Sequence, residues 1–365
     1  MTVYQKVIKP ILFTQDPERM HHLFNDLGWL IGSNLISKKI LELIIANYND
    51  DVLRTSIAGL DVKNPIGLGA GFDKEGKIVP TLEAVGFGFA EIGTITGQMS
   101  PGNNGVRLLR LVEDEALVVN YGLVSSGADR VKKRFKRYVK HNKWKIPVGI
   151  SVAKSNIPNL SGELGLDDLL SAYQKLEEFA DYITINVSCP NVGDAGQYCE
   201  NIQLYNELLM RIDAKNPKKP IFIKLSPDLS ENRLSSILEM TDKYSWAKGF
   251  VLTNLTHDRS GLKSLKLKKT VKGGVSGIGL KSKSNDVLKF MATRGRDRYE
   301  FIGLGGVNSV DDVYKKIRLG ASVVQLVTSL IYHGPFWIKY LNLQLAQRLK
   351  DDGFTNIKEA VGVDL

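Results

Sequence analysis

The 365-residue sequence has only two cysteines, Cys189 and Cys199, and no stretch of about 20 apolar residues that could span a bilayer. Two cysteines are too few for a disulfide-stabilised secreted fold, so we expect a reducing cytosolic setting and no integral membrane protein. The apolar run near the start is interrupted at residues 16–18, so we expect no secretory signal. We also expect no metal site, because the five histidines lack ligand spacing and the cysteines form no CxxC pair.

Positively charged residues are in excess over negatively charged ones. Lys and Arg number 49 and Asp and Glu 39, which gives a net charge of +10. This excess favours an anionic partner: a nucleic acid, an anionic lipid or a phosphorylated ligand. Two basic tracts stand out, residues 130–145 and 263–272. The first carries apolar residues on one face, which indicates a solvated outer helix rather than a nucleic-acid site, with lipid headgroup contact as a lesser alternative.

From about residue 64 onward, short β-branched runs alternate with segments of helical period. Strictly alternating units of this kind require a parallel sheet with right-handed crossovers. Eight units predict an α/β fold, a (β/α)8 TIM barrel over residues 51–365, although an open doubly wound sheet gives a similar pattern. The predicted strands are residues 65–69, 89–94, 147–153, 182–187, 220–225, 249–253, 301–304 and 322–326.

Residues 1–50 differ, because their pattern is helical with no strand between. Asp16 is a suitable N-cap, Pro17 suits the first turn, and Glu18 is favoured by the helix dipole. Apolar series at residues 20–31 and 35–44 therefore predict two helices in an N-terminal extension. These helices either pack on the barrel, or lie on a membrane or frame an apolar tunnel.

Polar or glycine residues follow nearly every predicted strand, at the end where a barrel of this type carries its active site. Gly305-Gly306 and Val327-Thr328-Ser329 follow the last two strands, where backbone amides commonly bind phosphate. We expect the glycine-rich residues 273–277 to lie in the long loop before these strands, where they could add further amides. These clusters predict a phosphate-bearing cofactor.

Two residues at the strand ends suggest the chemistry. Lys224 lies where a strand interior meets the pocket, and it would stabilise the N1/O2 edge of a reduced flavin or pair with a neighbouring acid. Cys189 lies between Asn186 and Asn191, which suggest a planar ligand read by hydrogen bonds. Its thiol could act as a base if the site lowers its pKa, whereas Cys199 fits a small buried apolar residue.

Ordered motifs over nearly the whole chain resemble the dihydroorotate dehydrogenases. They are NPIGLGAGFDKEGK, FAEIGTIT, SPGNNGVRLLRLVEDEALVVNYG, INVSCPN, IKLSPDLS, LTNLTHDR, GGVSG, FIGLGGVNS and QLVTSLIYHGP. The opening VIKPILFTQDPERMHHL resembles the N-terminal extension of the quinone-linked, membrane-associated class 2 enzymes.

The resemblance implies an FMN enzyme that oxidises (S)-dihydroorotate to orotate in pyrimidine synthesis. In the family a base removes the C5 proton, C6 delivers a hydride to flavin N5, and ubiquinone or menaquinone reoxidises the flavin. It further implies peripheral attachment to the cytoplasmic side of the cell membrane through the N-terminal helices. No nucleic-acid partner is expected.

The resemblance also assigns residues. It implies that FMN is held by Ala70, Gly71, Lys74, Thr94, Asn186, Lys224, Thr253, Gly277, Gly305, Gly306, Val327 and Thr328. It implies that the substrate is bound by Lys74, Asn186, Asn191 and Asn254. Arg110 matches an arginine at the quinone entrance, and Cys189 occupies the position of the catalytic base.

Several positions depart from the family. Class 2 enzymes usually have serine as the base, whereas Cys189 is of the class 1 type, so we predict activity that persists to lower pH than in serine relatives. Val119 replaces an asparagine that binds substrate, and we assign its contact to Asn120, which requires a one-residue shift of the loop. Residues 123–126, Ser151 and Ile278 also differ from the family pattern.

Other readings of the sequence stay open. One is a class 1 type dehydrogenase that uses fumarate or NAD, against which the N-terminal helices argue. Another is an RNA dihydrouridine synthase, which also uses cysteine and would suit the basic surface, but no further domain follows the barrel pattern. The last is a non-catalytic binding protein, which the retained lysines, asparagines and Cys189 make hard to accept.

Overall fold

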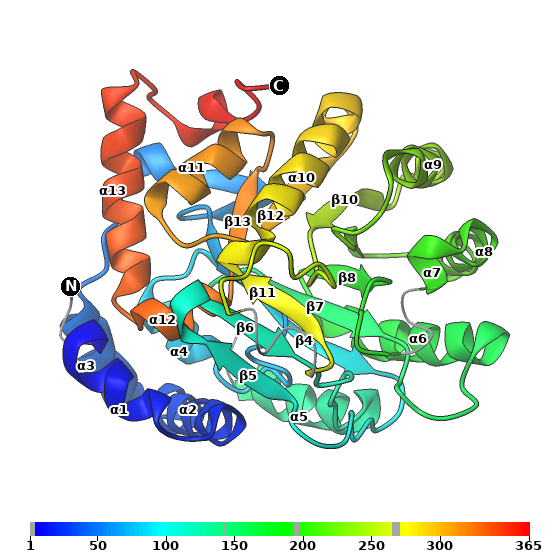
Figure 1. The fold of residues 1–365 in the computed structure, drawn as a ribbon, viewed down its shortest axis with the longest axis horizontal. Coiled ribbons are helices and arrows are strands. Elements are labelled where there is room, and N and C mark those ends of the chain that lie inside the picture. The colour runs from blue at the N-terminus through cyan, green and yellow to red at the C-terminus, as the bar shows by residue number, and fades with distance from the viewer. Residues whose placement is uncertain (1–3, 142–143, 193–196, 265–270) are drawn as a thin grey trace.

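The protein folds around a closed barrel of parallel strands (Figure 1). The computed structural model describes residues 4–141, 144–192, 197–264 and 271–365. Around the barrel the order is β10-β12-β13-β3-β4-β7-β8-β9. The strands are β3 (Ile66–Leu68), β4 (Phe89–Thr96), β7 (Val148–Ala153), β8 (Tyr182–Asn186), β9 (Ile221–Leu225), β10 (Ala247–Leu252), β12 (Glu300–Leu304) and β13 (Val323–Leu326). The predicted TIM barrel is confirmed and the open sheet is excluded, because β10 and β9 close the ring by hydrogen bonding.

Helices follow the strands and form the outer layer (Figure 1). They bury an apolar stripe against the sheet, as Leu166, Leu169 and Tyr173 of α6 do. The helices of this layer are α4 (Val79–Val85), α5 (Ala128–His141), α6 (Gly162–Leu176), α7 (Gln197–Glu200), α8 (Ile202–Asp213), α9 (Glu231–Thr241), α10 (Lys281–Gly295), α11 (Val310–Arg318), α12 (Thr328–His333) and α13 (Trp337–Asp351). The basic tract at residues 130–145 lies mainly on α5, and its residues 142–143 lie outside the described part.

Aromatic side chains fill the end of the barrel where the strands begin. Phe89 and Tyr182 are fully buried there. Each faces a strand glycine: a Cβ on Gly67 would lie 2.3 Å from the Phe89 ring, and one on Gly149 would lie 2.1 Å from the Tyr182 ring. A hairpin of β1 (Thr55–Ile57) and β2 (Leu60–Val62) adds apolar residues to this cluster. This end is therefore closed, and any site must be at the other end.

A small antiparallel sheet stands at the open end of the barrel. It has the order β11-β6-β5, with β5 (Leu108–Leu111), β6 (Ala116–Val119) and β11 (Gly274–Gly277). We expected residues 273–277 to form a glycine-rich loop, and that prediction of local structure was wrong. Four residues with two glycines carry no strand pattern of their own, so only the pairing with β6 makes them a strand.

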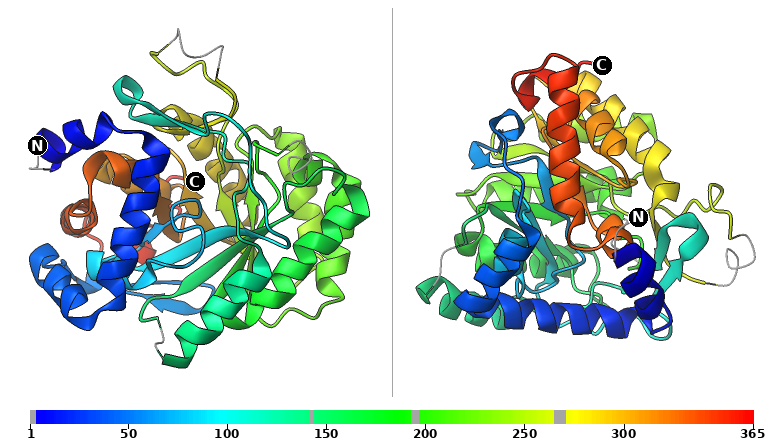
Figure 2. Two further views of the ribbon diagram at one scale, coloured as in Figure 1. Left: turned by 90° about the horizontal axis from the view of Figure 1, so that it is seen from below. Right: turned by 90° about the vertical axis from the view of Figure 1, so that its left-hand side faces the viewer.

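The N-terminal extension lies along one side of the barrel (Figure 2). The two predicted helices are confirmed as α2 (Pro17–Ser33) and α3 (Leu35–Ile45), preceded by a short turn of π-helix (Tyr4–Ile8) and α1 (Lys9–Phe13). The Asp16 carboxylate caps α2 by accepting a hydrogen bond from Arg19 N at 2.8 Å. An ion pair between Lys38 and Glu83 joins α3 to α4. The boundary at residue 50 stays a prediction.

Much of the apolar surface of these helices faces away from the barrel. Leu30, Leu35 and Ile36 are 60%, 82% and 72% exposed. Within the described residues, no helix is both long and apolar enough to cross a membrane.

Candidate active site

A deep cavity opens at the carboxyl end of the barrel strands, under the β11-β6-β5 sheet. It encloses about 1210 Å³ of empty space, including its open mouth. All the residues predicted to hold FMN line it: Ala70, Gly71, Lys74, Thr94, Asn186, Lys224, Thr253, Gly277, Gly305, Gly306, Val327 and Thr328. Cys189, Asn191 and Asn254 line it as well. The fold thus brings these predicted residues together in one cavity although the first and last of them, Ala70 and Thr328, are 258 positions apart in the chain.

Bare backbone forms the part of the cavity next to β12 and β13. Gly305 and Gly306 have φ angles of 107° and 72°, which other residues rarely adopt. A Cβ on Gly306 would lie 2.3 Å from the Cα of Lys281, so only glycine fits there. Beside these glycines, the hydroxyl groups of Thr328 and Ser276 form a hydrogen bond of 2.5 Å. This rim offers backbone amides and hydroxyl groups of the kind that hold a phosphate in barrels.

Lys224, on β9, is the buried cation of the cavity, with only 4% of its surface exposed. Among the described residues no group accepts a hydrogen bond from its Nζ, and it forms no salt bridge. Glu91 attracts it from a distance, but that carboxylate accepts hydrogen bonds from Thr184 and Gln325, at 2.8 and 3.1 Å. Burial lowers the pKa of Lys224. A buried cation without a protein partner fits the electron-rich edge of a bound ligand better than the acid pair we had also considered.

Amide side chains line the floor of the cavity in one hydrogen-bonded chain. Asn254 Nδ2 donates to the backbone oxygen of Ser188 at 3.0 Å and to Asn186 Oδ1 at 3.3 Å. Asn186 Nδ2 in turn donates to the hydroxyl group of Thr94 at 3.0 Å, and Thr94 meets Ser151 at 3.0 Å. These bonds fix which way each carboxamide faces. Such a surface can bind, through hydrogen bonds, a planar ligand whose edge carries alternating donors and acceptors.

Cys189 lies on the loop after β8 and is 6% exposed. Burial raises the pKa of its thiol to about 11, although a backbone hydrogen bond at Asn191 and the charge of Lys224 lower it. The site therefore does not itself provide the lowered pKa that a thiolate base needs at neutral pH. The comparison with serine relatives stays a prediction.

Lys74, after β3, is half-buried, and desolvation at the cavity wall lowers its pKa to about 7. Its Nζ lies 3.3 Å from the centre of the Tyr121 ring, an arrangement that stabilises the cation. Lys74 thus has an aromatic partner in place of a carboxylate and keeps its donors available to the cavity.

The structure does not bring Asn120 into the cavity. β6 pairs with β5 and β11 in regular register, with Val119 opposite Leu108 and Gly274, so the one-residue shift that we expected is absent. Val119 lines the cavity, and Asn120 instead accepts a hydrogen bond from Asn103 at 2.9 Å. Strand alternation explains this, because neighbouring residues of β6 face opposite sides. The structure thus places Asn120 outside this cavity, and its assignment to the substrate stays an untested prediction.

Arg110 lies at the junction of β5 and the N-terminal extension, outside the lining of the main cavity. Its Nη1 donates to the backbone oxygen of Gln15 at 2.8 Å, and its guanidinium lies 4.6 Å from the centre of the Phe13 ring. This is the position between extension and barrel that the resemblance implies for a quinone entrance. The role itself is a prediction.

Several cavity residues escaped the sequence reasoning. His21 of α2 lines the cavity beside Phe72 and Tyr121, and burial near Lys74 lowers its pKa to about 3, so its ring is neutral. A histidine within an amphipathic helix carries no signal of its own, and only the packing of α2 against the barrel places it.

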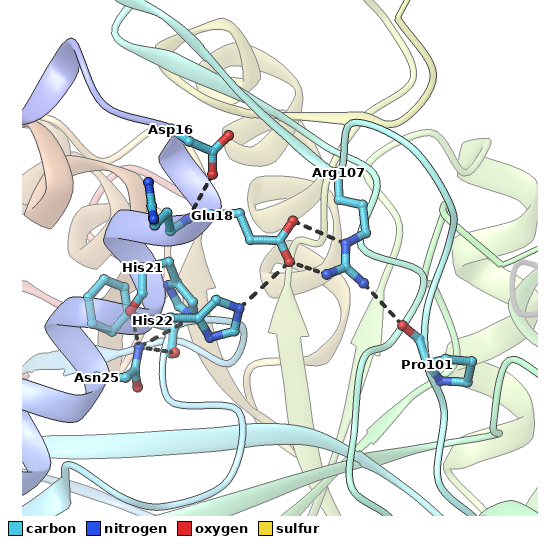
Figure 3. A network of polar contacts seen from close by, with 9 residues as sticks. Asp16, Glu18, His21, His22, Asn25, Pro101 and Arg107 are labelled. Atoms are coloured by element: carbon cyan, nitrogen blue, oxygen red, sulfur yellow. Dashed lines mark hydrogen bonds and ion pairs between the residues drawn. The ribbon is translucent and has the colours of Figure 1, made fainter.

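An ion pair joins Glu18 of α2 to Arg107, which precedes β5 (Figure 3). Arg107 also donates to the backbone oxygen of Pro101 at 3.1 Å, so the extension is tied to the segment before β5. The pairing of residues 89 positions apart could not be predicted from the sequence.

Comparisons with known proteins agree with this geometry. The family model described as dihydroorotate dehydrogenase matches residues 52–349. A dihydroorotate dehydrogenase (quinone) of Gloeobacter violaceus is 35% identical over 359 residues, which are 98% of each chain. One of Crocosphaera subtropica is 37% identical over 87% of this chain and 84% of its own.

The fold matches as well as the sequence. A crystal structure of DHODH from Eimeria tenella in complex with ferulenol superposes with a TM-score of 0.83 at 27% identity and covers 96% of both chains. The matched relatives share the N-terminal extension, because the Gloeobacter alignment spans nearly the whole chain. The chain therefore belongs to the dihydroorotate dehydrogenase family and resembles its quinone-type members over its full length.

Proposed function

We propose that this chain oxidises (S)-dihydroorotate to orotate and passes the electrons to a quinone. The observation that carries the proposal is the shared cavity in which Cys189, the buried cation Lys224 and the amide chain of Asn186 and Asn254 meet. A planar heterocycle with polar edges fits this set, and the names of the relatives supply its identity.

FMN fits the cavity as the cofactor. Lys224 offers the buried positive charge, and the amides next to Gly305, Gly306 and Thr328 offer the phosphate site. When bound, FMN accepts a hydride and returns electrons one or two at a time to an acceptor. The protein supplies its position and its electrostatics: Lys224 stabilises negative charge at the edge that it faces.

The remaining groups act on the substrate. Asn186, Asn191, Asn254 and Lys74 bind its carboxylate, amide and carbonyl groups and so exclude water from them. Cys189 removes the C5 proton as general base. Because the thiol lies in the same cavity as Lys224, the cation also stabilises the thiolate that must form first.

The extension serves the quinone. Exposed Leu30, Leu35 and Ile36 give α2 and α3 an apolar outer surface, which we assign to peripheral contact with the cytoplasmic side of the cell membrane. Ubiquinone or menaquinone would leave the lipid between these helices and Arg110 and approach the cavity past His21.

The purified protein should be yellow, and anaerobic dihydroorotate should bleach it. The reason is that the substrate can reduce a bound flavin, while exclusion of oxygen prevents its reoxidation. Absorbance near the flavin maximum measures the change, and addition of a soluble quinone should restore the colour. A yellow protein that dihydroorotate does not reduce would contradict the proposed substrate but agree with the proposed cofactor.

Val119→Asn should tighten the binding of orotate about two- to tenfold, because a carboxamide at this cavity position adds one hydrogen bond to a polar ligand. Titration of the flavin spectrum with orotate measures the affinity. Asn120→Ala is the matched control, and it should leave the affinity nearly unchanged because that side chain faces Asn103. If both substitutions changed the orotate affinity equally, the placement of residue 119 inside the cavity and of residue 120 outside it would be wrong.

A further inference from the structure

A buried lysine lies behind the glycine turn that follows β12. Lys316 of α11 is 1% exposed and does not line the active-site cavity. Its Nζ donates hydrogen bonds to Ser284 Oγ at 2.8 Å and to Asn285 Oδ1 at 3.0 Å, both on α10. Within the described part of the chain it forms no ion pair: Asp312 attracts it from a distance, but that carboxylate pairs with Lys281 at 2.7 Å. Lysine is rarely buried so fully without a paired acid, so its presence at this position needs a reason.

The charge of Lys316 depends on the groups around it. Burial lowers its pKa to about 7, the attraction of Asp312 raises it in part, and the charge of Lys281 lowers it again. The amine is therefore only partly protonated at neutral pH. A further anion close to Lys316 favours the protonated form, because opposite charges attract in a site with little water.

Ser284 connects Lys316 to the glycine turn. The Ser284 hydroxyl group donates to the backbone oxygen of Leu304 at 2.6 Å, and its own oxygen accepts from Lys316. Leu304 immediately precedes Gly305, and a Cβ on Gly305 would lie 3.2 Å from the Ser284 Cβ. Lys316 thus orients the Ser284 hydroxyl group, and Ser284 fixes the point at which the chain enters the turn.

A second set of charged side chains holds the other end of the turn. Asp312 Oδ2 accepts a hydrogen bond from Asn308 N at 2.9 Å, and Asn308 comes two residues after Gly306. The same carboxylate pairs with Lys281, whose backbone lies against Gly306. The turn is therefore held at both ends by α10 and α11, so its amides keep one arrangement. These are the amides that we assign to the phosphate of the cofactor.

We propose that Lys316 is a positioning residue of the cofactor site, which holds the Gly305-Gly306 turn through Ser284 and adds positive charge behind the flavin phosphate. The inference rests on the function proposed above. Lys316 acts from outside the cavity, through one side chain and one backbone oxygen. Because the turn is assigned to the phosphate, loss of Lys316 should weaken the phosphate contacts and leave the binding of the flavin ring system unchanged.

A comparison of FMN with riboflavin, which has the same ring system and no phosphate, tests the proposal. The full-length protein is stripped of its flavin, and each flavin is titrated back while the quenching of its fluorescence is measured. We expect Lys316→Met to weaken FMN binding about ten- to hundredfold and to leave riboflavin binding within twofold of the wild type. Ser284→Ala should weaken FMN binding about three- to tenfold, because it removes the hydrogen bond to Leu304 and leaves the charge in place.

Lys315→Met is the matched control, since it makes the same change at the next residue of α11. Lys315 is exposed and pairs with Asp364 at 2.8 Å, so both affinities should match the wild type. Riboflavin binding also reports a folded cavity, and Ser284→Ala carries the test if Lys316→Met does not fold.

Equal FMN affinities for Lys316→Met, Ser284→Ala and the wild type would overturn the positioning role and leave the proposed function intact. An equal loss of FMN and riboflavin affinity in either variant would do the same, because it would show general damage to the cavity. A wild-type protein that binds FMN no more tightly than riboflavin would overturn both the phosphate site of the proposed function and the role of Lys316.

Discussion

Replacement of Cys189 by alanine should lower the rate of flavin reduction by dihydroorotate about 10²- to 10⁴-fold, the usual contribution of a general base. The protein should remain folded and yellow, because Cys189 belongs to a small apolar cluster with Val192 and Leu123, separate from the main core. Anaerobic stopped-flow measurement of the bleaching rate at saturating substrate gives the effect. A variant that keeps more than a tenth of the rate would show that another group removes the proton.

The pH profile gives a second test of the same residue. Burial raises the pKa of the Cys189 thiol to about 11, and the active form is the thiolate. Below that pKa the thiolate fraction rises about tenfold per pH unit, so the reduction rate should increase with pH from neutral into alkaline solution. Cys189→Ser should displace this rise to still higher pH, because a hydroxyl group is less acidic than a thiol. A flat wild-type profile between pH 6 and about 9 would mean that substrate binding or Lys224 lowers the thiol pKa far more than the empty cavity does.

Deletion of residues 1–45 should abolish quinone reduction and spare flavin reduction. The physical reason is that the extension supplies the apolar surface around Arg110 and His21, whereas Cys189, Lys224 and the asparagines all belong to the barrel. Two assays on one preparation measure the result: anaerobic bleaching by dihydroorotate and steady-state turnover with a quinone. Quinone turnover that survives the deletion would contradict the assigned route.

The deletion also removes packing, since Ile45 is buried and Lys38 pairs with Glu83. A full-length variant therefore accompanies it. Leu30→Glu/Ile36→Glu places two charges on exposed positions and leaves the barrel untouched. It should reduce turnover with quinone in vesicles, because charged groups oppose insertion into lipid, and leave turnover with a soluble quinone analogue unchanged. Equal loss with both acceptors would point to a damaged site instead of lost membrane contact.

Local sequence patterns predicted the elements well where the apolar residues form a continuous run or recur with a helical period. The barrel strands, buried on both faces, are of the first kind, and α2 with its Asp16 cap is of the second. The β11-β6-β5 sheet was not predicted, because its strands are only four residues long, β11 has a glycine at each end, and the three are held together by pairing with one another. The register of this sheet also determines that Val119, and not Asn120, faces the cavity. The sequence pattern alone could not show this register.

The sequence by itself determined the α/β barrel, the helical extension and the set of strand-end residues that face one cavity, because alternating periodicity places strand ends at the same edge. The tertiary structure alone decided which further groups join them. It brought His21 from α2 to the cavity and, within the part of the chain that the structure describes, left Lys224 buried without a protein partner. These features arise from contacts between segments far apart in the chain, whose burial and charge depend on packing and have no local signature in the sequence.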